Sequence, residues 1–534
     1  MWGRRWREAL WDEIARGGAP WDLIVVGGGI AGAGVFREAA RRGLRTLLLE
    51  GRDFASGTSS RSSKLVHGGI RYLQHGHWRL TRESLRERDR LLREAPGLVE
   101  PLFFVRPVYA HESRWLYRAA FLAYGLLAGR RQHRYYNAAA VRRLAPSLSS
   151  EDVVGAYGYM EAGVDDARLV LRLIREGVRD GGRALSYCAV DALVLENGAV
   201  AGVRARDDET GRTAELRARV VVNATGTRAD ALRQEVGARA LIRPLRGSHL
   251  VFAADRLPME QALSFTHPRD GRHVFACSWE GATMLGTTDC DHDAPLDEEP
   301  HISEGEVAYL MEVVARYFPA LRLDRRDVTA TWAGIRPVVG TQRADPSAES
   351  REGLLVDERG LVSVTGGKLT TVRPTALLAL ERAAARLSPL PDVPKGARLF
   401  DEADPASVEH PALDRATRRR LLGHYGREAA DVLAAAREGE LAVVPGTRTL
   451  WAQVRFAARA EGVTHLDDLL LRRVRIGLVL PEGGAALLPA IRTLVQDEMG
   501  WSDQRWSAEE AAYRARWRAL HSVPGLSPRS SGGR

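Results

Sequence analysis

The feature that most constrains the fold is a glycine-rich turn between two apolar runs. Residues 21–26 (WDLIVV) precede Gly27, Gly29 and Gly32, a helical pattern follows, and the second apolar run ends at Glu50. Glycines at this spacing allow a tight turn, close approach of the backbone to a pyrophosphate, and tight helix packing. The helix N-terminus adds free N–H donors and the positive end of a dipole. The pattern predicts a Rossmann-like unit that binds a dinucleotide, with Glu50 accepting from a ribose.

The next segment favours one dinucleotide over the others. An acidic Glu50 suits an unphosphorylated adenosine ribose, which indicates NAD or FAD rather than NADP. Residues 53–76 are polar and glycine-rich where an NAD-binding domain would continue with another strand and helix. Such a segment suits the long pyrophosphate and ribityl chain of FAD, which is the predicted cofactor. Its predicted contacts in this segment are Thr58, Ser59, Ser62, Ser63 and Lys64.

Length and composition limit the class of protein. A chain of 534 residues with 45% hydrophobic content predicts a globular protein of two or three domains. The chain has no uninterrupted apolar run of about 18 residues and no secretory signal pattern, so we expect it neither to span a membrane nor to be secreted. Its 3 cysteines are widely spaced and form no CxxC pair. We therefore expect no disulfide framework, no metal site, and a reducing cytoplasm.

The positive charge of the chain leaves several partners open. A net charge of +9 suits an anionic substrate, an anionic membrane surface or nucleic acid. Nucleic-acid binding requires a clustered basic stripe with aromatic residues. Arginine is instead spread over the whole chain, so we expect no nucleic-acid partner. Lysine occurs only at Lys64, Lys368 and Lys395, and a flexible ammonium is not equivalent to a guanidinium.

Further motifs extend over nearly the whole chain. They are TSSRSSKLVHGGIRYL (58–73), DDARLV (165–170), VVNATG (221–226), GSHLVF (247–252), LGTTD (285–289), AGIRPVVG (333–340), VTGGKLTT (364–371) and LDDLLLRRVRIGL (466–478). In this order they resemble the FAD-dependent glycerol-3-phosphate dehydrogenase family. Val474 departs from the threonine that is frequent in the family, and residues 1–20 have no recognised counterpart.

The resemblance implies an α/β fold. We expect a Rossmann-like FAD-binding domain interleaved with an antiparallel-sheet substrate domain, plus a C-terminal α-helical domain. The expected parts are an oxidoreductase region over 20–390, a helical domain over 400–520 and a flexible tail over 521–534. Within the first part, FAD-binding segments are expected near 20–90, 160–240 and 355–387, and substrate-binding segments near 90–160 and 240–355.

The resemblance also implies a reaction, the oxidation of sn-glycerol 3-phosphate to dihydroxyacetone phosphate by hydride transfer from C2 to FAD. This chemistry needs a base for the hydroxyl proton and cations for the phosphate. Guanidinium forks suit phosphate, which favours Arg71 and Arg336 beside glycines. The predicted substrate contacts are Arg71, Tyr72, His249, Arg336, Arg351 and Lys368.

Three residues compete as the catalytic base. His67 titrates near neutral pH and adjoins two glycines that let a substrate approach. His249 is a competing candidate, and Lys368 is a third if burial lowers its pKa. The residues predicted to be catalytic are His67, Arg336 and Lys368.

Other predicted FAD contacts lie far along the chain. Gly366 and Gly367 form a turn before a helix, whose N-terminus is suited to stabilise negative charge on reduced flavin. Gly226 ends a buried strand that leads back to the cofactor. The resemblance places the backbone of Ala189 and Val190 at the adenine end.

The electron acceptor stays open between a quinone and oxygen. We expect a quinone, a peripheral position on the cytoplasmic face of the cell membrane, and a possible homodimer. Trp2, Trp6 and Leu10 recur at helical spacing among arginines, which predicts an interfacial helix, with packing on the body as the alternative. Residues 115–136 are expected to pack as a core helix, with membrane contact as the alternative. Rival activities are a glycerol-3-phosphate oxidase and an FAD-dependent amino-acid or small-acid oxidase.

Overall fold

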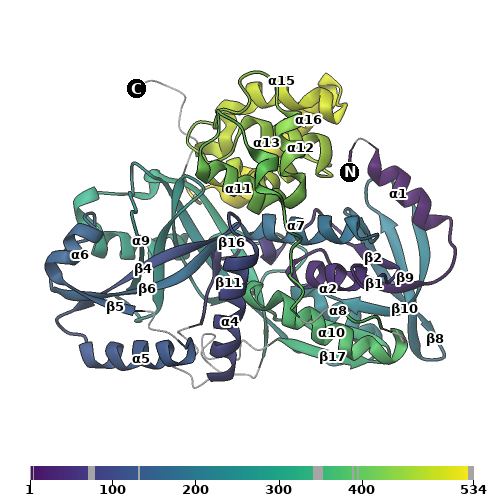
Figure 1. Cartoon of the computed structure of the whole chain (residues 1–534), viewed down its shortest axis with the longest axis horizontal. Helices are drawn as coiled ribbons and strands as arrows, with labels where there is room; N and C mark the ends of the chain where they lie inside the picture. The colour runs from purple at the N-terminus through teal and green to yellow at the C-terminus, as the bar shows by residue number, and fades with distance from the viewer. Residues whose placement is uncertain are drawn as a thin grey trace.

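The computed structural model contains two sheets and a helical domain. It describes residues 2–3, 5–69, 78–129, 133–340, 353–387, 390–393 and 396–526. In Figure 1 the two sheets lie side by side, and the C-terminal helices, coloured green to yellow, lie above them. This arrangement confirms the predicted fold class.

The first sheet carries the glycine-rich turn. Its strands run in the order β17-β18-β10-β1-β2-β7, and β8 and β9 extend it from β10. β1 is parallel to β2 and β10, and β10 is parallel to β18, so the carboxyl ends of these strands share one edge. The strands are β1 (Trp21–Val26), β2 (Thr46–Leu49), β7 (Arg183–Leu185), β8 (Cys188–Glu196), β9 (Ala199–Asp207), β10 (Thr213–Asn223), β17 (Leu354–Glu358) and β18 (Leu361–Thr365).

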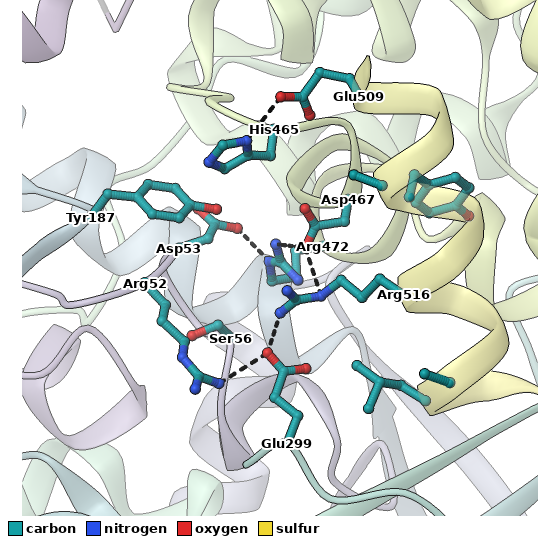
Figure 2. Close-up of a pocket in the computed structure, with 14 residues that line it drawn as sticks. Arg52, Asp53, Ser56, Tyr187, Glu299, His465, Asp467, Arg472, Glu509 and Arg516 are labelled. Atoms are coloured by element: carbon teal, nitrogen blue, oxygen red, sulfur yellow. Dashed lines mark hydrogen bonds and ion pairs between the residues drawn. The ribbon is translucent and has the colours of Figure 1, made fainter. Parts of the chain in front are cut away.

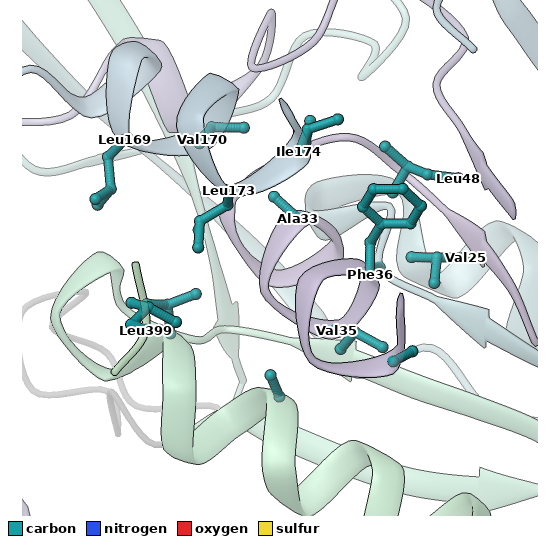
Figure 3. Packing of buried hydrophobic residues seen from close by; sticks show 14 of the residues in the cluster. Val25, Ala33, Val35, Phe36, Leu48, Leu169, Val170, Leu173, Ile174 and Leu399 are labelled. Atoms are coloured by element: carbon teal, nitrogen blue, oxygen red, sulfur yellow. The ribbon is translucent and has the colours of Figure 1, made fainter. Parts of the chain in front are cut away.

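Helices cover this sheet and close its core. They are α2 (Ile30–Ala40), α7 (Asp166–Arg179), α8 (Ala229–Glu235) and α10 (Val372–Leu387). Figure 3 shows Phe36 of α2 packed among Val25, Leu48 and Ile174, all fully buried. Gly34 lets α10 approach α2, because a Cβ there would lie 2.6 Å from the Val372 side chain. This close packing fixes the helix that follows the glycine turn.

The second sheet is antiparallel except where β12 joins β4. Its strands run in the order β15-β11-β14-β13-β12-β4-β6-β3, with β16 paired to β11 and β5 to β6. The strands are β3 (Leu65–Val66), β4 (Val99–Tyr109), β5 (His133–Asn137), β6 (Val153–Val164), β11 (Ile242–Ala253), β12 (Ala262–Thr266), β13 (His273–Trp279), β14 (Ala282–Gly286), β15 (Cys290–Asp291) and β16 (Val328–Val339). The chain thus enters this sheet at β3, earlier than the boundary expected near residue 90.

Helices flank the second sheet and build the C-terminal domain. Beside the sheet lie α4 (Trp78–Glu94), α5 (Arg114–Leu127), α6 (Ala138–Leu144) and α9 (Glu304–Tyr317). The C-terminal domain contains α11 (Arg415–Tyr425), α12 (Ala429–Ala435), α13 (Trp451–Ala460), α14 (Ile476–Val479), α15 (Leu488–Met499) and α16 (Asp503–His521). A π-helix, Asp468–Arg473, precedes α14. Among the described residues, no helix combines the length and apolar character that crossing a membrane requires.

The N-terminal helix α1 (Trp6–Ala15) packs on the body of the protein. Trp2 is 6% exposed and stacks on Trp6 and on Phe54, with ring centroids 5.0 and 5.2 Å apart. Leu10 is buried as well. The prediction of an interfacial helix here is wrong, because its large apolar side chains point into the protein.

Helix α5 shows the opposite arrangement. Trp115, Leu122 and Leu126 lie on one face at helical spacing and are 63%, 49% and 83% exposed. Only Phe121, Tyr124 and Gly125 of this helix are buried. The expectation of a core helix is therefore right for one face only, and the other presents large apolar side chains to solvent.

Candidate active site

The glycine turn between β1 and α2 has room only for glycine. Gly27 has φ 109° and a Cβ there would lie 2.5 Å from the carbonyl oxygen of Ala224, which follows β10. A Cβ on Gly32 would overlap the carbonyl oxygen of Gly27. The turn is thus tight, and bare backbone faces the edge where the parallel strands end, as a pyrophosphate site requires.

Residues 50–59 surround this turn. The Glu50 carboxylate accepts the N–H groups of Gly28 at 2.6 Å and of Arg52 at 2.9 Å, and burial raises its pKa. A carboxylate has about four acceptor positions, so these two bonds leave capacity for ribose hydroxyls. Ser59 Oγ accepts the N–H of Ile30 at 2.9 Å, at the first residue of α2. Both predicted cofactor contacts therefore lie directly beside the turn.

Other predicted cofactor contacts converge on the same edge. Cys188 N–H donates to the Glu50 carbonyl at 2.8 Å, which places Ala189 and Val190 at the start of β8 beside the end of β2. Gly226, with φ 63°, accepts from the Thr365 hydroxyl at 2.9 Å, and Gly366 follows with φ 71°. The ends of β1, β10 and β18 thus carry glycines side by side. These residues fit an extended dinucleotide, because glycines at the ends of these strands leave backbone open to it.

Gly367 and Lys368 lead into the helix expected at the flavin. Lys368 occupies the N-cap position of a 3-10 turn, Leu369–Thr371, that continues directly into α10. The predicted helix N-terminus after the glycine pair is therefore present. The catalytic role of Lys368 stays a prediction.

The Lys64 and Ser62 side chains both bind a buried carboxylate. Lys64 Nζ is buried and lies 2.9 Å from both carboxylate oxygens of Asp166, and it donates to the Ser60 carbonyl at 2.5 Å. The Ser62 hydroxyl donates to Asp166 at 2.7 Å. Burial opposes ionisation of Asp166, but Lys64 and Arg475 together lower its pKa. These two side chains therefore stabilise a buried carboxylate, and their contact with FAD stays a prediction.

Residues 53–64, which hold the predicted FAD contacts Thr58 to Lys64, are here called the cofactor segment. One face of the β11–β16 pair forms a wall beside this segment. His249 pairs with Trp332 and Leu245 with Arg336, and residues two apart in a strand share a face. His249, Trp332 and Arg336 therefore point to the same side. Gly334 lies between them and against residue 61, where a Cβ would be 2.6 Å from the Arg61 carbonyl oxygen. The cofactor segment and this wall are in direct contact.

Arg336 is fixed in place yet reachable from solvent. Its Nη1 lies 2.7 Å from Asp289 Oδ1 and its Nη2 donates to Thr287 Oγ1 at 3.2 Å. The side chain is 26% exposed. Gly247 makes room for the guanidinium, because a Cβ there would overlap Arg336 Nη2. Asp289 thus orients a cation.

His249 is buried beside this cation. Its ring stacks on Trp332 with centroids 5.0 Å apart, and its Nε2 forms a hydrogen bond with Ser63 Oγ at 3.0 Å. Burial, followed by the charges of Lys64 and Arg336, lowers the pKa of His249 well below 6.5. Its Nδ1 has no hydrogen-bond partner within the described part of the chain. The ring is therefore a neutral imidazole with a hydrogen bond to the Ser63 hydroxyl, and the contact of Ser63 with FAD stays a prediction.

The remaining predicted residues keep their status as predictions. Arg71, Tyr72 and Arg351 lie outside the described residues. His67 directly follows β3 and is partly exposed.

Sequence reasoning missed two residues of this site. Asp166 is the buried carboxylate at the start of α7, and Trp332 is the ring beneath His249. The DDARLV motif could have indicated Asp166, since two adjacent acidic residues before a helical pattern mark the N-terminus of a helix. No local pattern identifies Trp332, because its role depends on the pairing of β11 with β16.

Comparisons with known proteins agree with this geometry. The family model described as FAD dependent oxidoreductase matches residues 22–382. The C-terminal domain of alpha-glycerophosphate oxidase matches residues 395–506. Fold and site thus define a flavin-dependent oxidoreductase, and FAD is its cofactor.

Similar proteins narrow this class. The chain is 35% identical to a glycerol-3-phosphate dehydrogenase of Mycobacterium leprae, over 96% of this chain and 90% of that protein. It is 34% identical to one of Synechocystis, over 92% and 95%. A crystal structure of the Bacillus halodurans glycerol-3-phosphate dehydrogenase complexed with FAD has a TM-score of 0.79 and 28% identity, over 99% of this chain and 100% of that chain. The chain belongs to the FAD-dependent glycerol-3-phosphate dehydrogenase family.

Proposed function

We propose that the protein oxidises sn-glycerol 3-phosphate to dihydroxyacetone phosphate. FAD supplies the acceptor for the hydride that leaves C2, while the hydroxyl proton passes to a protein base and the C2–O bond becomes a carbonyl. The observation that carries the proposal is a partly exposed Arg336, oriented by Asp289, on the same sheet face as a neutral His249. The names of the similar dehydrogenases support the same substrate.

Arg336 has the properties of a phosphate ligand. A guanidinium is always charged and donates in a planar fork that matches phosphate oxygens. The Asp289 carboxylate, 2.7 Å away, holds its direction. Arg336 therefore binds the phosphate end of the substrate and orients C2 toward the cofactor segment.

His249 is the base that the geometry favours. When Nε2 donates to Ser63 Oγ, Nδ1 is an acceptor, and a buried acceptor without a partner is costly. A substrate hydroxyl would satisfy Nδ1 and give up its proton there. His67 remains the competing candidate.

Anaerobic flavin reduction tests this function. Mixing the holoenzyme with sn-glycerol 3-phosphate is expected to bleach the flavin absorbance. Glycerol, which lacks the phosphate, and amino acids are expected to leave the absorbance unchanged. Bleaching by an amino acid but not by sn-glycerol 3-phosphate would replace the proposal with the amino-acid oxidase alternative.

We also propose that the protein is cytoplasmic, binds the cytoplasmic face of the cell membrane through α5, and passes electrons to a quinone. The exposed face of α5 carries Trp115, Leu122 and Leu126, and Arg114 and Arg118 lie over the Trp115 ring at 5.5 and 5.2 Å. Apolar side chains flanked by arginine suit the interface of an anionic bilayer, where a quinone resides. In Figure 1 this helix lies at the lower edge, away from the helical domain.

Vesicle binding and reoxidation test these two steps. The double variant Trp115→Ser with Leu126→Ser is expected to abolish flotation with anionic vesicles. The control is Leu195→Ser, which removes a leucine that is 46% exposed but lies outside α5, and it should leave flotation unchanged. After anaerobic reduction, a quinone is expected to reoxidise the flavin faster than oxygen does. Faster reoxidation by oxygen would identify a glycerol-3-phosphate oxidase instead.

A further inference from the structure

The motif LDDLLLRRVRIGL of the C-terminal domain has no role in the reaction described so far. It forms the π-helix Asp468–Arg473 and the start of α14. Arg472, Arg473 and Arg475 in this motif are all buried. Charged groups are rarely buried without a partner, so the structure must supply carboxylates or carbonyls for all three.

The first partner lies in the cofactor segment. Arg473 binds the fully buried Asp53 with both arms of its guanidinium, at 2.7 Å each, and Arg472 donates to the same carboxylate. Burial opposes ionisation of Asp53, but Arg473 and Arg472 lower its pKa. Figure 2 shows Asp53 and Arg472 facing each other across the junction of the two domains. Asp53 is therefore a carboxylate held by the C-terminal domain.

Asp53 is linked directly to the glycine turn. The next residue, Phe54, packs on Gly28, where a Cβ would lie 2.8 Å from the Phe54 ring. Ala55 N–H then donates to the Gly28 carbonyl at 3.0 Å. Arg473 thus binds Asp53, and the next residue, Phe54, contacts the glycine turn.

The second partner repeats this arrangement. Arg475 donates to the Ser60 carbonyl at 3.3 Å and binds the Asp166 carboxylate. The preceding residue, Ser59, accepts the N–H of Ile30 at 2.9 Å. Each end of residues 53–60 is therefore bound by an arginine of the C-terminal domain. Next to each bound residue, another residue of the segment contacts the glycine turn.

Charged side chains are numerous at the junction beside this segment. A cavity of about 510 Å³ opens beside it, lined by charged side chains (Figure 2). Glu299 binds Arg52 at 2.9 Å and also Arg516 of α16. Leu469, Leu470 and Val474 of the same motif pack in one buried apolar cluster with the second sheet. The ion pairs add directional contacts to this packing, and they are the contacts that reach residues 53–60.

We propose that Arg473 and Arg475 are positioning residues for FAD. They hold residues 53–60 against the glycine turn. The C-terminal helical domain, although it does not contain the turn, thereby lowers the rate at which FAD dissociates. Without either guanidinium, this segment loses an anchor and opens more often. The proposal rests on FAD binding alone and is independent of the substrate and of the electron acceptor.

FAD release from the holoenzyme tests this role. Arg473→Met and Arg475→Met are each expected to release FAD at least about tenfold faster, since each leaves a buried carboxylate without its partner and so destabilises the closed position of residues 53–60. The rise of free-flavin fluorescence after dilution measures release, at a temperature where circular dichroism shows every variant folded. Arg473→Lys is expected to restore only part of the retention, because an ammonium cannot bind both carboxylate oxygens as a fork.

A matched control separates positioning from general stability. Arg455 is buried in the same domain and pairs with Glu440 and Glu498, both in that domain. Arg455→Met is expected to lower the melting temperature but to leave FAD release within about twofold of the parent, because it removes no anchor of the cofactor segment. Equal acceleration in Arg455→Met, or unchanged release in both test variants, overturns the proposal.

A further variant tests the same link from the other domain. If neither methionine variant folds, Asp53→Asn removes the charge that Arg473 binds and is expected to accelerate FAD release in the same way. Unchanged release in a folded Asp53→Asn protein counts against the proposal.

Discussion

The cofactor wall and the substrate wall of this site are built by different means. The cofactor wall consists of backbone at the ends of β1, β10 and β18, where Gly27 and Gly32 leave no room for a side chain. The substrate wall consists of side chains, His249, Trp332 and Arg336, on two antiparallel strands. Adding a carbon atom to the cofactor wall should therefore weaken FAD binding. Removing a functional group from the substrate wall should instead slow the reaction.

The largest expected effect comes from adding one carbon to the cofactor wall. In Gly32→Ala the new Cβ overlaps the Gly27 carbonyl oxygen, so the turn must move. We expect FAD affinity to fall on the order of 100-fold or more, equivalent to about 3 kcal/mol. Flavin content after gel filtration measures this loss.

Gly305→Ala is the control for that change. Gly305 lies in the first turn of α9, where the nearest atom to a Cβ would be 3.9 Å away. Its flavin content should match that of the parent protein. Full flavin retention in Gly32→Ala would mean that the turn tolerates a side chain and that the account of the cofactor wall is wrong.

Removing the imidazole should damage the substrate wall alone. His249→Asn is expected to slow anaerobic flavin reduction by roughly 10²–10⁴-fold, as for loss of a general base, with flavin content unchanged. Stopped-flow absorbance measures the rate, and His67→Gln in parallel tests the other candidate. A larger effect in His67→Gln would assign the base to His67.

The same histidine predicts a pH dependence. Burial lowers the pKa of His249, so the ring stays unprotonated to a lower pH than an ordinary histidine. A base with a lowered pKa keeps its activity as pH falls, and loses it only below that pKa. The reduction rate should therefore stay level from pH 8 to below pH 6.5. A decline centred near pH 6.5 points to a histidine with an ordinary pKa.

The smallest expected effect concerns the orientation of Arg336. In Asp289→Asn the guanidinium keeps a hydrogen-bond partner but loses a charged one, so we expect kcat/KM to fall about tenfold, or 1.4 kcal/mol. Arg256→Lys, which alters an exposed pair with Asp327, is the control and should leave kcat/KM unchanged. Steady-state kinetics of both variants check this. A loss of flavin in Asp289→Asn would show that the two walls are not separable.

The same contrast explains what the sequence predicts well. Backbone sites follow local rules, so the glycine pattern and Glu50 predicted the turn, its strands and its helix correctly. Side-chain roles depend on distant partners. Lys64 lies in a motif rich in predicted cofactor contacts, and its ammonium binds Asp166, 102 residues further along the chain.

Two helices show the same limit. The segments α1 and α5 both combine tryptophan, leucine and arginine, and the sequence favoured the first as interfacial and the second as core. The structure buries Trp2 and exposes Trp115. Helical periodicity finds an apolar face but cannot identify its partner, because Phe54, which covers Trp2, lies in another segment.

The most direct test of the two-wall account is anaerobic flavin reduction by Arg336→Lys over a range of sn-glycerol 3-phosphate concentrations, with flavin content measured on the same sample. The account predicts full flavin content. It also predicts that the substrate concentration giving half of the maximal reduction rate rises about 100-fold, because a bidentate phosphate contact is lost. Loss of flavin in proportion to loss of rate, or an unchanged concentration dependence, would contradict it.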